Sequence, residues 1–374
     1  VGVGLGVRWS IERWNAWRRK LLHMGQSEDG QSVAMDTMPL RWGHLRVVMV
    51  ASLGQLTGGA LSTLIGVVLP LMQVVSHSHL SPLTQGILAS MSLTGIMVGS
   101  ILIGRWSDER GYLRYLRLSP AVILVGATVA MFSTSVVGLA TGLFMMGFGV
   151  GGEYSLDSDY ISEIMPRRWR MFMVGVAKSS SAIGNIAMAF ICFYILRHWS
   201  AEYHWNGLFL LVAILAVVML LSSIRFAESP AWLITHARSE EAERAVRYFL
   251  GSDVTIGDVG TRSAQEVSLK AMFRGDNLRR VILSGVPWAC EGFGVYGVGV
   301  FLPILIMAMG LGKDTEGVKH IASVVELSGY VNISVAAGFI IGLALIRRLY
   351  HVRQQAVGFI LSGIGLALLI VAYR

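Results

Sequence analysis

Four carboxylates lie in one otherwise apolar, glycine-rich stretch of the sequence, GFGVGGEYSLDSDYISEIMPRRWR. They are Glu153, Asp157, Asp159 and Glu163. A carboxyl group with little water around it can pair with a cation, or it can bind and release protons. If the stretch is helical, Glu153 and Asp157 share one face, whereas Asp159 points elsewhere. The spacing therefore predicts two acids that face one neighbouring helix or one cavity.

The apolar character of this stretch extends along the whole chain. Of its 374 residues, 54% are hydrophobic and only 14% are charged, and the mean hydropathy is +0.60. A soluble globular protein carries roughly 25% charged residues. The composition therefore predicts a multi-pass membrane protein with the lipid bilayer as its surroundings.

The net charge of +8 does not predict a nucleic-acid partner, because basic loops on the cytoplasmic side of a membrane protein account for it. The sequence also has no zinc-ligand spacing, no phosphate-binding loop and no nucleophile elbow. We therefore expect no enzyme activity, no catalytic residue, no cofactor and no metal.

Stretches of about 20 apolar residues are long enough to cross a bilayer as helices. We predict nine, at 47–69, 83–104, 119–135, 138–164, 171–196, 206–224, 280–309, 321–346 and 355–373. Basic residues are frequent in alternate loops, which predicts a cytoplasmic N-terminus. The predicted organisation is a cytoplasmic segment (1–46), a six-helix bundle (47–224), a cytoplasmic loop with short helices (225–279) and a partial C-terminal bundle (280–374).

The long loop carries helix start and stop signals. Ser229 or Pro230 is expected to begin a helical stretch that ends at Gly251, and Ser239 is expected to begin a second short helix inside it.

Depth in the membrane separates the charged residues. At 1.5 Å per residue from Pro166, Asp157 and Asp159 lie about 10–14 Å in and Glu153 about 20 Å in, whereas Glu163 lies near the surface. Lys178 lies about 10–12 Å along the next predicted helix. We therefore predict a contact between Lys178 and Asp157 or Asp159, with Asp157 favoured. The alternative is that the lysine extends to the membrane surface.

Four motifs together resemble the major facilitator superfamily, in particular its sugar porter and metabolite:proton symporter families. GRWSDERGYLR matches the signature between the second and third helices, and GVGGEYSLDSDYISEIMPRRWR is similar to the fourth helix. RFAESPAWL resembles the segment after the sixth helix, and WACEGFGVYGVGVFLP resembles the seventh. The resemblance covers about residues 40–373.

The sequence also departs from the family pattern. The superfamily fold has twelve helices and this chain ends after the ninth, so we expect either a fragment or a truncated protein. The first helix lacks the acid found in phosphate:proton relatives and carries Gln55 instead. Leu143 stands where sugar porters usually carry an arginine before the fourth-helix motif. Between the eighth and ninth helices, LIRRLYHVR lacks the acid and the glycine expected of the repeated first motif.

The resemblance implies an all-α secondary active transporter in the cytoplasmic membrane. It would move a small polar metabolite, either a sugar or a small organic acid, by proton symport with alternating access. The expected partners are this solute and protons, and we expect a monomer. The alternatives are an uncoupled facilitator and a degenerate or receptor-like relative that does not transport.

The candidate residues form two groups. The expected solute and proton path contains Gln55, Glu153, Asp157, Lys178, Glu291 and Tyr296. The expected gate contains Gly104, Asp108, Gly111, Arg114, Glu163, Arg170 and Glu228. We expect Glu163 to pair with an arginine such as Arg114 or Arg170, and Asp108 to face the N-terminal end of a helix in the other half. A packing role for Glu153, a structural hydrogen bond for Glu291 and a simple interfacial position for Glu163 are the alternatives.

Overall fold

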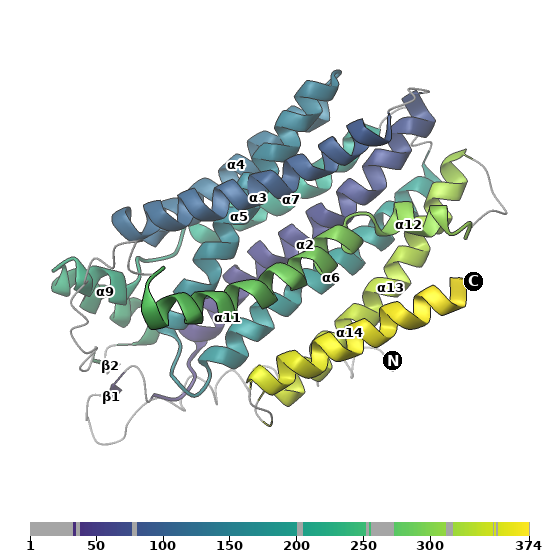
Figure 1. Ribbon diagram of the computed structural model, residues 1–374. Helices are drawn as coiled ribbons and strands as arrows, with labels where there is room; N and C mark the ends of the chain where they lie inside the picture. Colours follow the sequence, from purple (N-terminus) through teal and green to yellow (C-terminus); the bar gives the residue numbers. More distant parts are fainter. Residues whose placement is uncertain are drawn as a thin grey trace, which may run out of the picture.

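Long helices account for most of the structure, as the apolar stretches predict. The computed structural model describes residues 33–34, 38–76, 81–199, 205–251, 254–255, 273–311, 317–346, 348 and 351–373. The long helices lie side by side along one direction, with α9 and two short strands at one end (Figure 1). Most of the predicted N-terminal segment, and residues 256–272 of the long loop, lie outside the described residues.

The first part of the chain forms six long helices. They are α2 (Trp42–Ser76), α3 (Pro82–Arg110), α4 (Tyr112–Phe132), α5 (Val136–Ile164), α6 (Arg170–His198) and α7 (Phe209–Ser223), the last preceded by the turn η2 (Trp205–Leu208). Helix α2 packs against α5, α6 and α7, while α5 also packs against α3 and α4. A large apolar core fills the space between these helices and includes Leu64, Met146 and Phe209.

The loop after α7 contains α8 (Pro230–Thr235) and α9 (Ser239–Leu250). The Ser229 side chain accepts a hydrogen bond from the Trp232 N–H and begins α8, and Gly251 ends α9 with a positive φ of 104°. These boundaries confirm the predicted start and stop signals. The short strands β1 (Val33–Ala34) and β2 (Val254–Thr255) pair in parallel and are a small addition to the all-helical fold.

The last part of the chain contains α11 (Gly275–Gly292), η3 (Phe293–Val298), α12 (Leu302–Ala308), α13 (Gly317–Leu345) and α14 (His351–Tyr373). Helix α13 packs against α6, whereas α11 has no buried residue. The predicted continuous span 280–309 is wrong in detail, because η3 is a π-helical segment between two α-helices. Four glycines, at 292, 294, 297 and 299, weaken the α-helical backbone there.

Eight helices in the described residues are long and apolar enough to cross a membrane. The ninth predicted span corresponds to α14, in which a shorter apolar helix, Val352–Leu368, is found. Hydropathy therefore located the spans well, although the seventh is interrupted by the π-helical segment η3.

Glycines let α3 and α5 approach backbone to backbone. A Cβ atom at Gly99 of α3 would clash with the Phe148 carbonyl oxygen of α5, and one at Gly151 of α5 would clash with the Ile96 carbonyl oxygen of α3. Membrane helices commonly use small residues for such close packing.

We expect Gly99→Ala to destabilise this helix pair by about 1–3 kcal/mol, because the added methyl group meets backbone that cannot turn away. The melting temperature of the purified protein measures the effect. Gly86→Ala is the matched control, since nothing lies within 4 Å of a Cβ atom at this position of the same helix. Equal melting temperatures for the two variants would contradict the packing argument.

Candidate solute path and gate

Two acids lie buried in the middle of the helix bundle. Glu153 and Asp157 are each 2% exposed and lie on the face of α5 that meets α2, as their spacing predicts. The Gln55 side-chain amide of α2 donates a hydrogen bond of 3.1 Å to Asp157 Oδ2. A Cβ atom at Gly54 would lie only 2.7 Å from Asp157 Oδ2 and 3.1 Å from Glu153 Oε2. Glycine at position 54 therefore makes room for both carboxyl groups.

Neither acid is fully satisfied by its neighbours. Glu153 Oε1 and Asp157 Oδ1 are buried without a hydrogen-bond partner. The ion pairs found between described residues, such as Arg105–Glu109 and Arg238–Glu241, lie elsewhere. A buried charge without a partner is costly, so this is an environment in which a carboxyl group can take up a proton.

Lys178 lies close to these acids but does not form the predicted ion pair with Asp157 or Asp159. Its ammonium nitrogen lies 5.2 Å from the centroid of the Tyr154 ring and 5.3 Å from that of the Trp288 ring. It interacts electrostatically with Asp157 and, more weakly, with Glu291 and Asp159. The predicted pairing is therefore not an ion pair within 4 Å: Asp157 accepts the hydrogen bond of Gln55, and two rings flank the ammonium group, a favourable cation–π position.

The second part of the chain contributes three side chains beside Lys178 and Tyr154. Trp288 and Glu291 lie on α11, and Tyr296 lies on the π-helical segment η3. The Tyr296 hydroxyl lies near that of Tyr154. Glu291 itself is exposed.

We call these eight residues the path cluster: Gln55, Glu153, Tyr154, Asp157, Lys178, Trp288, Glu291 and Tyr296. It contains all six residues that the sequence analysis placed on the path. Tyr154 was missed, although Gly58 signals it. Gly58 lies one helical turn after Gly54, and a Cβ atom there would clash with the Tyr154 hydroxyl.

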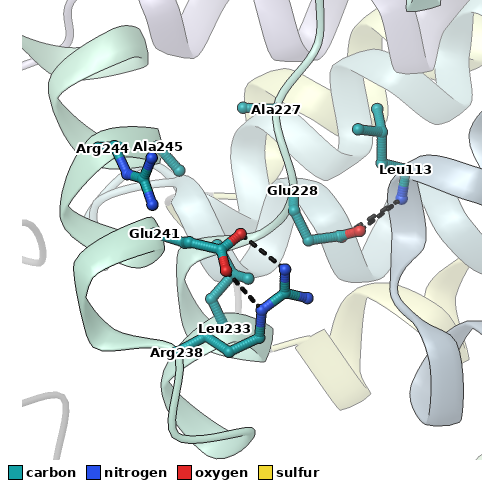
Figure 2. A pocket seen from close by; sticks show the side chains of 8 residues that line it. All are labelled: Leu113, Ala227, Glu228, Leu233, Arg238, Glu241, Arg244 and Ala245. Carbon is teal, nitrogen blue, oxygen red and sulfur yellow. Dashed lines mark hydrogen bonds and ion pairs between the residues drawn. The ribbon is translucent and has the colours of Figure 1, made fainter.

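A second cluster lies at the end of the bundle near α9. The Glu228 carboxylate accepts hydrogen bonds from the backbone N–H groups of Tyr112 at 2.8 Å, Leu113 at 3.1 Å and Ser229 at 3.0 Å. Figure 2 shows it turned toward Leu113. It therefore caps the N-terminus of α4, where unpaired N–H groups and the helix dipole favour a negative charge.

Gly111 leaves room for the Glu228 carboxylate at the N-terminus of α4. Its φ of 94° favours glycine, and a Cβ atom there would clash with the Glu228 carboxylate. Gly104 differs, because a Cβ atom at that position would touch Ser155 only at an ordinary distance of 3.5 Å. The first glycine of the motif is therefore not required for close packing in this structure.

Glu163 is bound by hydroxyl groups rather than by the predicted arginines. It accepts hydrogen bonds from the Tyr112 hydroxyl at 3.2 Å and from the Ser229 hydroxyl. Arg170 donates instead to the Met165 carbonyl oxygen at 3.3 Å, and Arg114 is exposed. The prediction was wrong because the segment around Glu228 packs against the start of α4 and fills the space beside Glu163.

Asp108 also differs from its predicted position. Its carboxylate side chain is exposed, and its backbone carbonyl accepts a hydrogen bond of 2.8 Å from the Trp232 indole. The acid that faces a helix N-terminus is Glu228, and that helix, α4, belongs to the same six-helix part of the chain. We call Tyr112, Glu163, Glu228 and Ser229 the gate cluster.

A pocket of about 420 Å³ lies beside the gate cluster. It is lined by Leu113, Ala227, Glu228, Leu233, Arg238, Glu241, Arg244 and Ala245. Arg238 and Glu241, at the start of α9, pair at 2.7 Å on one side of it (Figure 2). The pocket shares no residue with the path cluster, so it is not part of the candidate path. In the part of the chain that the structure describes, no group of three His, Cys, Asp or Glu side chains could hold a metal ion.

The comparison with protein families decides the class of this protein. The family model described as "Sugar (and other) transporter" matches residues 47–372. The chain belongs to this family. It is therefore a multi-pass membrane protein of a transporter family rather than an enzyme, and the resemblance to the major facilitator superfamily is confirmed.

Curated relatives include transporters of different solutes. The chain is 24% identical over 339 residues to the inner membrane metabolite transport protein YgcS of Escherichia coli, covering 90% of this chain and 72% of that protein. It is 24% identical over 335 residues to the niacin transporter NiaP of Acinetobacter baylyi, covering 87% and 72%. The glucose transporter GlcP of Staphylococcus epidermidis is 27% identical over 242 residues, which cover 63% of this chain and 53% of that protein.

Solved structures show the same fold. The xylose transporter XylE from E. coli, in a partially occluded inward open conformation, superposes with a TM-score of 0.64 at 19% identity, covering 82% of this chain and 74% of that chain. The proton:xylose symporter XylE bound to 6-bromo-6-deoxy-D-glucose gives a TM-score of 0.59 at 20% identity, covering 82% of this chain and 70% of that chain. These matches confirm the predicted major facilitator fold.

Proposed function

We propose that this chain is a secondary active transporter that moves a small polar metabolite across the cytoplasmic membrane by proton symport. The observation that carries the proposal is the buried pair Glu153 and Asp157, each with an unpartnered oxygen, next to side chains from both parts of the chain. The transport of niacin and of glucose by two relatives, and proton:xylose symport by XylE, support the same class of function.

In this proposal the path cluster binds the solute and the proton. A proton on Asp157 or Glu153 removes a buried negative charge, which alters the interaction with Gln55 and Lys178. Glu291 and Tyr296 then extend the cluster from the second part of the chain. The six-helix bundle (47–224) and the C-terminal bundle (280–374) are the two bodies that rock around the bound solute.

The gate cluster holds the bundle closed at the end near α9, which we propose is the cytoplasmic end. Glu228 and Glu163 join the linker after α7 to the start of α4 and the end of α5. Asp108, Arg114 and Arg170 lie around this joint, with Gly104 and Gly111 in the same motif. The proposal includes a cytoplasmic N-terminus, based on the basic loops, and a monomeric transporter.

Uptake into liposomes containing the purified protein tests the proposal. Sugars and small organic acids are offered with and without an inward proton gradient. A proton symporter accumulates one of them above its outside concentration only when the gradient is present.

An uncoupled facilitator is the alternative, and the uncharged Gln55 in the first long helix favours it. A facilitator would bring the solute to equal concentrations on both sides of the membrane, with or without the proton gradient. A degenerate, receptor-like relative would show no uptake above that of protein-free liposomes.

A further inference from the structure

A histidine caps the first turn of α2. Arg41 is the N-cap residue, because its carbonyl oxygen accepts the N–H groups of His44 and Leu45 and α2 begins at the next residue. The Nδ1 atom of His44 accepts the backbone N–H of Arg41 in return, at 2.9 Å. Glutamate or glutamine commonly makes this reciprocal bond from the third helical position. A histidine makes it sensitive to protonation, because an imidazolium has no acceptor atom.

The His44 ring is buried in its neutral form. Its side chain is 0% exposed, and Nδ1 can accept the Arg41 N–H only when the proton of the ring is on Nε2. This Nε2 atom is buried without a hydrogen-bond partner. A second proton would remove the acceptor of the cap and place a positive charge at a helix N-terminus, where the helix dipole opposes it. The packed start of α2 therefore accommodates the neutral ring alone.

Neighbouring charges do not compensate an imidazolium at this position. Arg41 is the charged side chain that acts on the ring, and it carries the same sign. The ion pairs between described residues do not include His44. Ionisable side chains on α2 and on the helices packed against it near this end include Arg46 of α2, Asp159 and Glu163 of α5, Arg170 of α6, and Arg247 and Tyr248 of α9.

The C-terminal end of α9 packs directly on this capped turn. A Cβ atom at Gly43 would clash with the Phe249 carbonyl oxygen, so the two backbones are in contact there. The Arg41 guanidinium donates a hydrogen bond to the Leu250 carbonyl oxygen in the last turn of α9. Arg41 therefore connects the two helices: its backbone N–H is bound by His44, and its side chain is bound to α9.

Helix α9 in turn holds the linker that carries Glu228. The Tyr248 hydroxyl donates a hydrogen bond of 3.0 Å to the Arg225 carbonyl oxygen. The Phe226 ring packs edge to face against that of Phe249, with 5.4 Å between the centroids. Only Ala227 separates Phe226 from Glu228 of the gate cluster. A displacement of α9 from α2 would therefore reach the gate cluster through this linker.

We propose that His44 makes the contact between α2 and α9 sensitive to pH: the neutral ring holds α9 on the start of α2, and protonation of the ring releases it. The assignment of this end to the cytoplasm rests on the proposed function. Release of α9 frees the linker before Glu228 and loosens the gate cluster. Because symport delivers protons to the cytoplasm, acid on that side acts back on the gate.

Hydrogen–deuterium exchange of the purified chain in lipid nanodiscs tests the proposal, without solute and without a proton gradient. Exchange is measured about one pH unit above and about one unit below the ordinary histidine pKa of about 6.5, and rates are corrected for the intrinsic effect of pH on amides. His44→Gln keeps a capping acceptor that does not titrate. His198→Gln is the matched control, since His198 is an exposed histidine at the C-terminal end of α6.

In the wild type we expect the amides of α9 to lose about tenfold in protection in the acidic sample. A released His44 takes up a proton with its ordinary pKa, so one pH unit below that value favours the released state by about tenfold, and one unit above it has almost no effect. The contact is therefore stable above about pH 6.5 and is lost as the pH falls through that value. His44→Gln should protect α9 equally at both pH values, and His198→Gln should behave as the wild type does.

Equal protection of α9 in the wild type at both pH values would overturn the proposal. So would a tenfold loss that persists in His44→Gln, because another group would then be titrating. The wild type alone provides a second measurement should His44→Gln fail to fold: the loss must be confined to α9, the linker and the first turn of α2, and an equal loss in the middle of α4 would contradict a local release.

The outcomes for this proposal and for transport are separable. Proton-driven accumulation of a solute, together with pH-independent protection of α9, leaves the transport proposal standing and removes the role of His44. Loss of α9 protection in acid that His44→Gln abolishes, without uptake of any solute, leaves the pH-sensitive contact standing and removes the transport proposal.

Discussion

Asp157→Asn is expected to abolish accumulation of the solute against its gradient while solute exchange across the membrane continues. Asparagine keeps the shape of the side chain, and its carbonyl oxygen can still accept the hydrogen bond that Gln55 donates to Asp157 Oδ2. An amide cannot release a proton at physiological pH. Binding and rocking of the bundles are therefore retained, whereas the coupling between proton and solute is lost.

Two assays on the same liposomes measure this separation. Uptake driven by an inward proton gradient should fall to simple equilibration, and exchange of internal unlabelled for external labelled solute should persist. Asp276→Asn is a suitable control, because Asp276 is an exposed aspartate in the first turn of α11. Full proton-driven accumulation by Asp157→Asn would show that another group, with Glu153 and Glu291 the next candidates, carries the proton.

Glu228→Ala is expected to lower the rate of transport about tenfold or more and to lower the melting temperature. The carboxylate accepts N–H groups from Tyr112, Leu113 and Ser229. Removing it leaves these donors without an acceptor at a helix N-terminus, and a hydrogen bond to a charged group is worth about 1.5–3 kcal/mol. A loss of this size changes the population of a closed state by about tenfold or more.

The control for this variant is Glu243→Ala in α9. Glu243 pairs with Arg247 at 3.4 Å, and its side chain is 60% exposed, so the pair contributes at most about 1 kcal/mol. Glu228→Gln should have a smaller effect than Glu228→Ala, because one acceptor oxygen remains. Normal uptake rates in Glu228→Ala would show that the gate cluster has no role in the transport cycle.

Local features of the chain were readable from the sequence alone. The spans follow from hydropathy, because a helix in lipid must present about 20 apolar residues whatever its neighbours are. The start of α8 at Ser229 and the end of α9 at Gly251 follow from the chemistry of residues within one helical turn. The shared face of Glu153 and Asp157 follows from the helical repeat. These signals depend on residues close together in the chain.

The partners of the charged side chains were decided only by the tertiary structure. Depth along two helices placed Lys178 level with Asp157, but depth carries no information on how far each helix is rotated about its axis. The rotation turns Asp157 toward Gln55 and leaves Lys178 between Tyr154 and Trp288.

The gate cluster shows the same division. The sequence placed Glu163 and Glu228 in motifs that belong together, and it assigned arginines to Glu163 by charge alone. The structure bonds Glu163 to the hydroxyl groups of Tyr112 and Ser229, and Glu228 to the backbone of α4. A hydrogen bond requires a donor and an acceptor within about 3 Å, and residues more than fifty positions apart reach that distance only when the helices between them have packed.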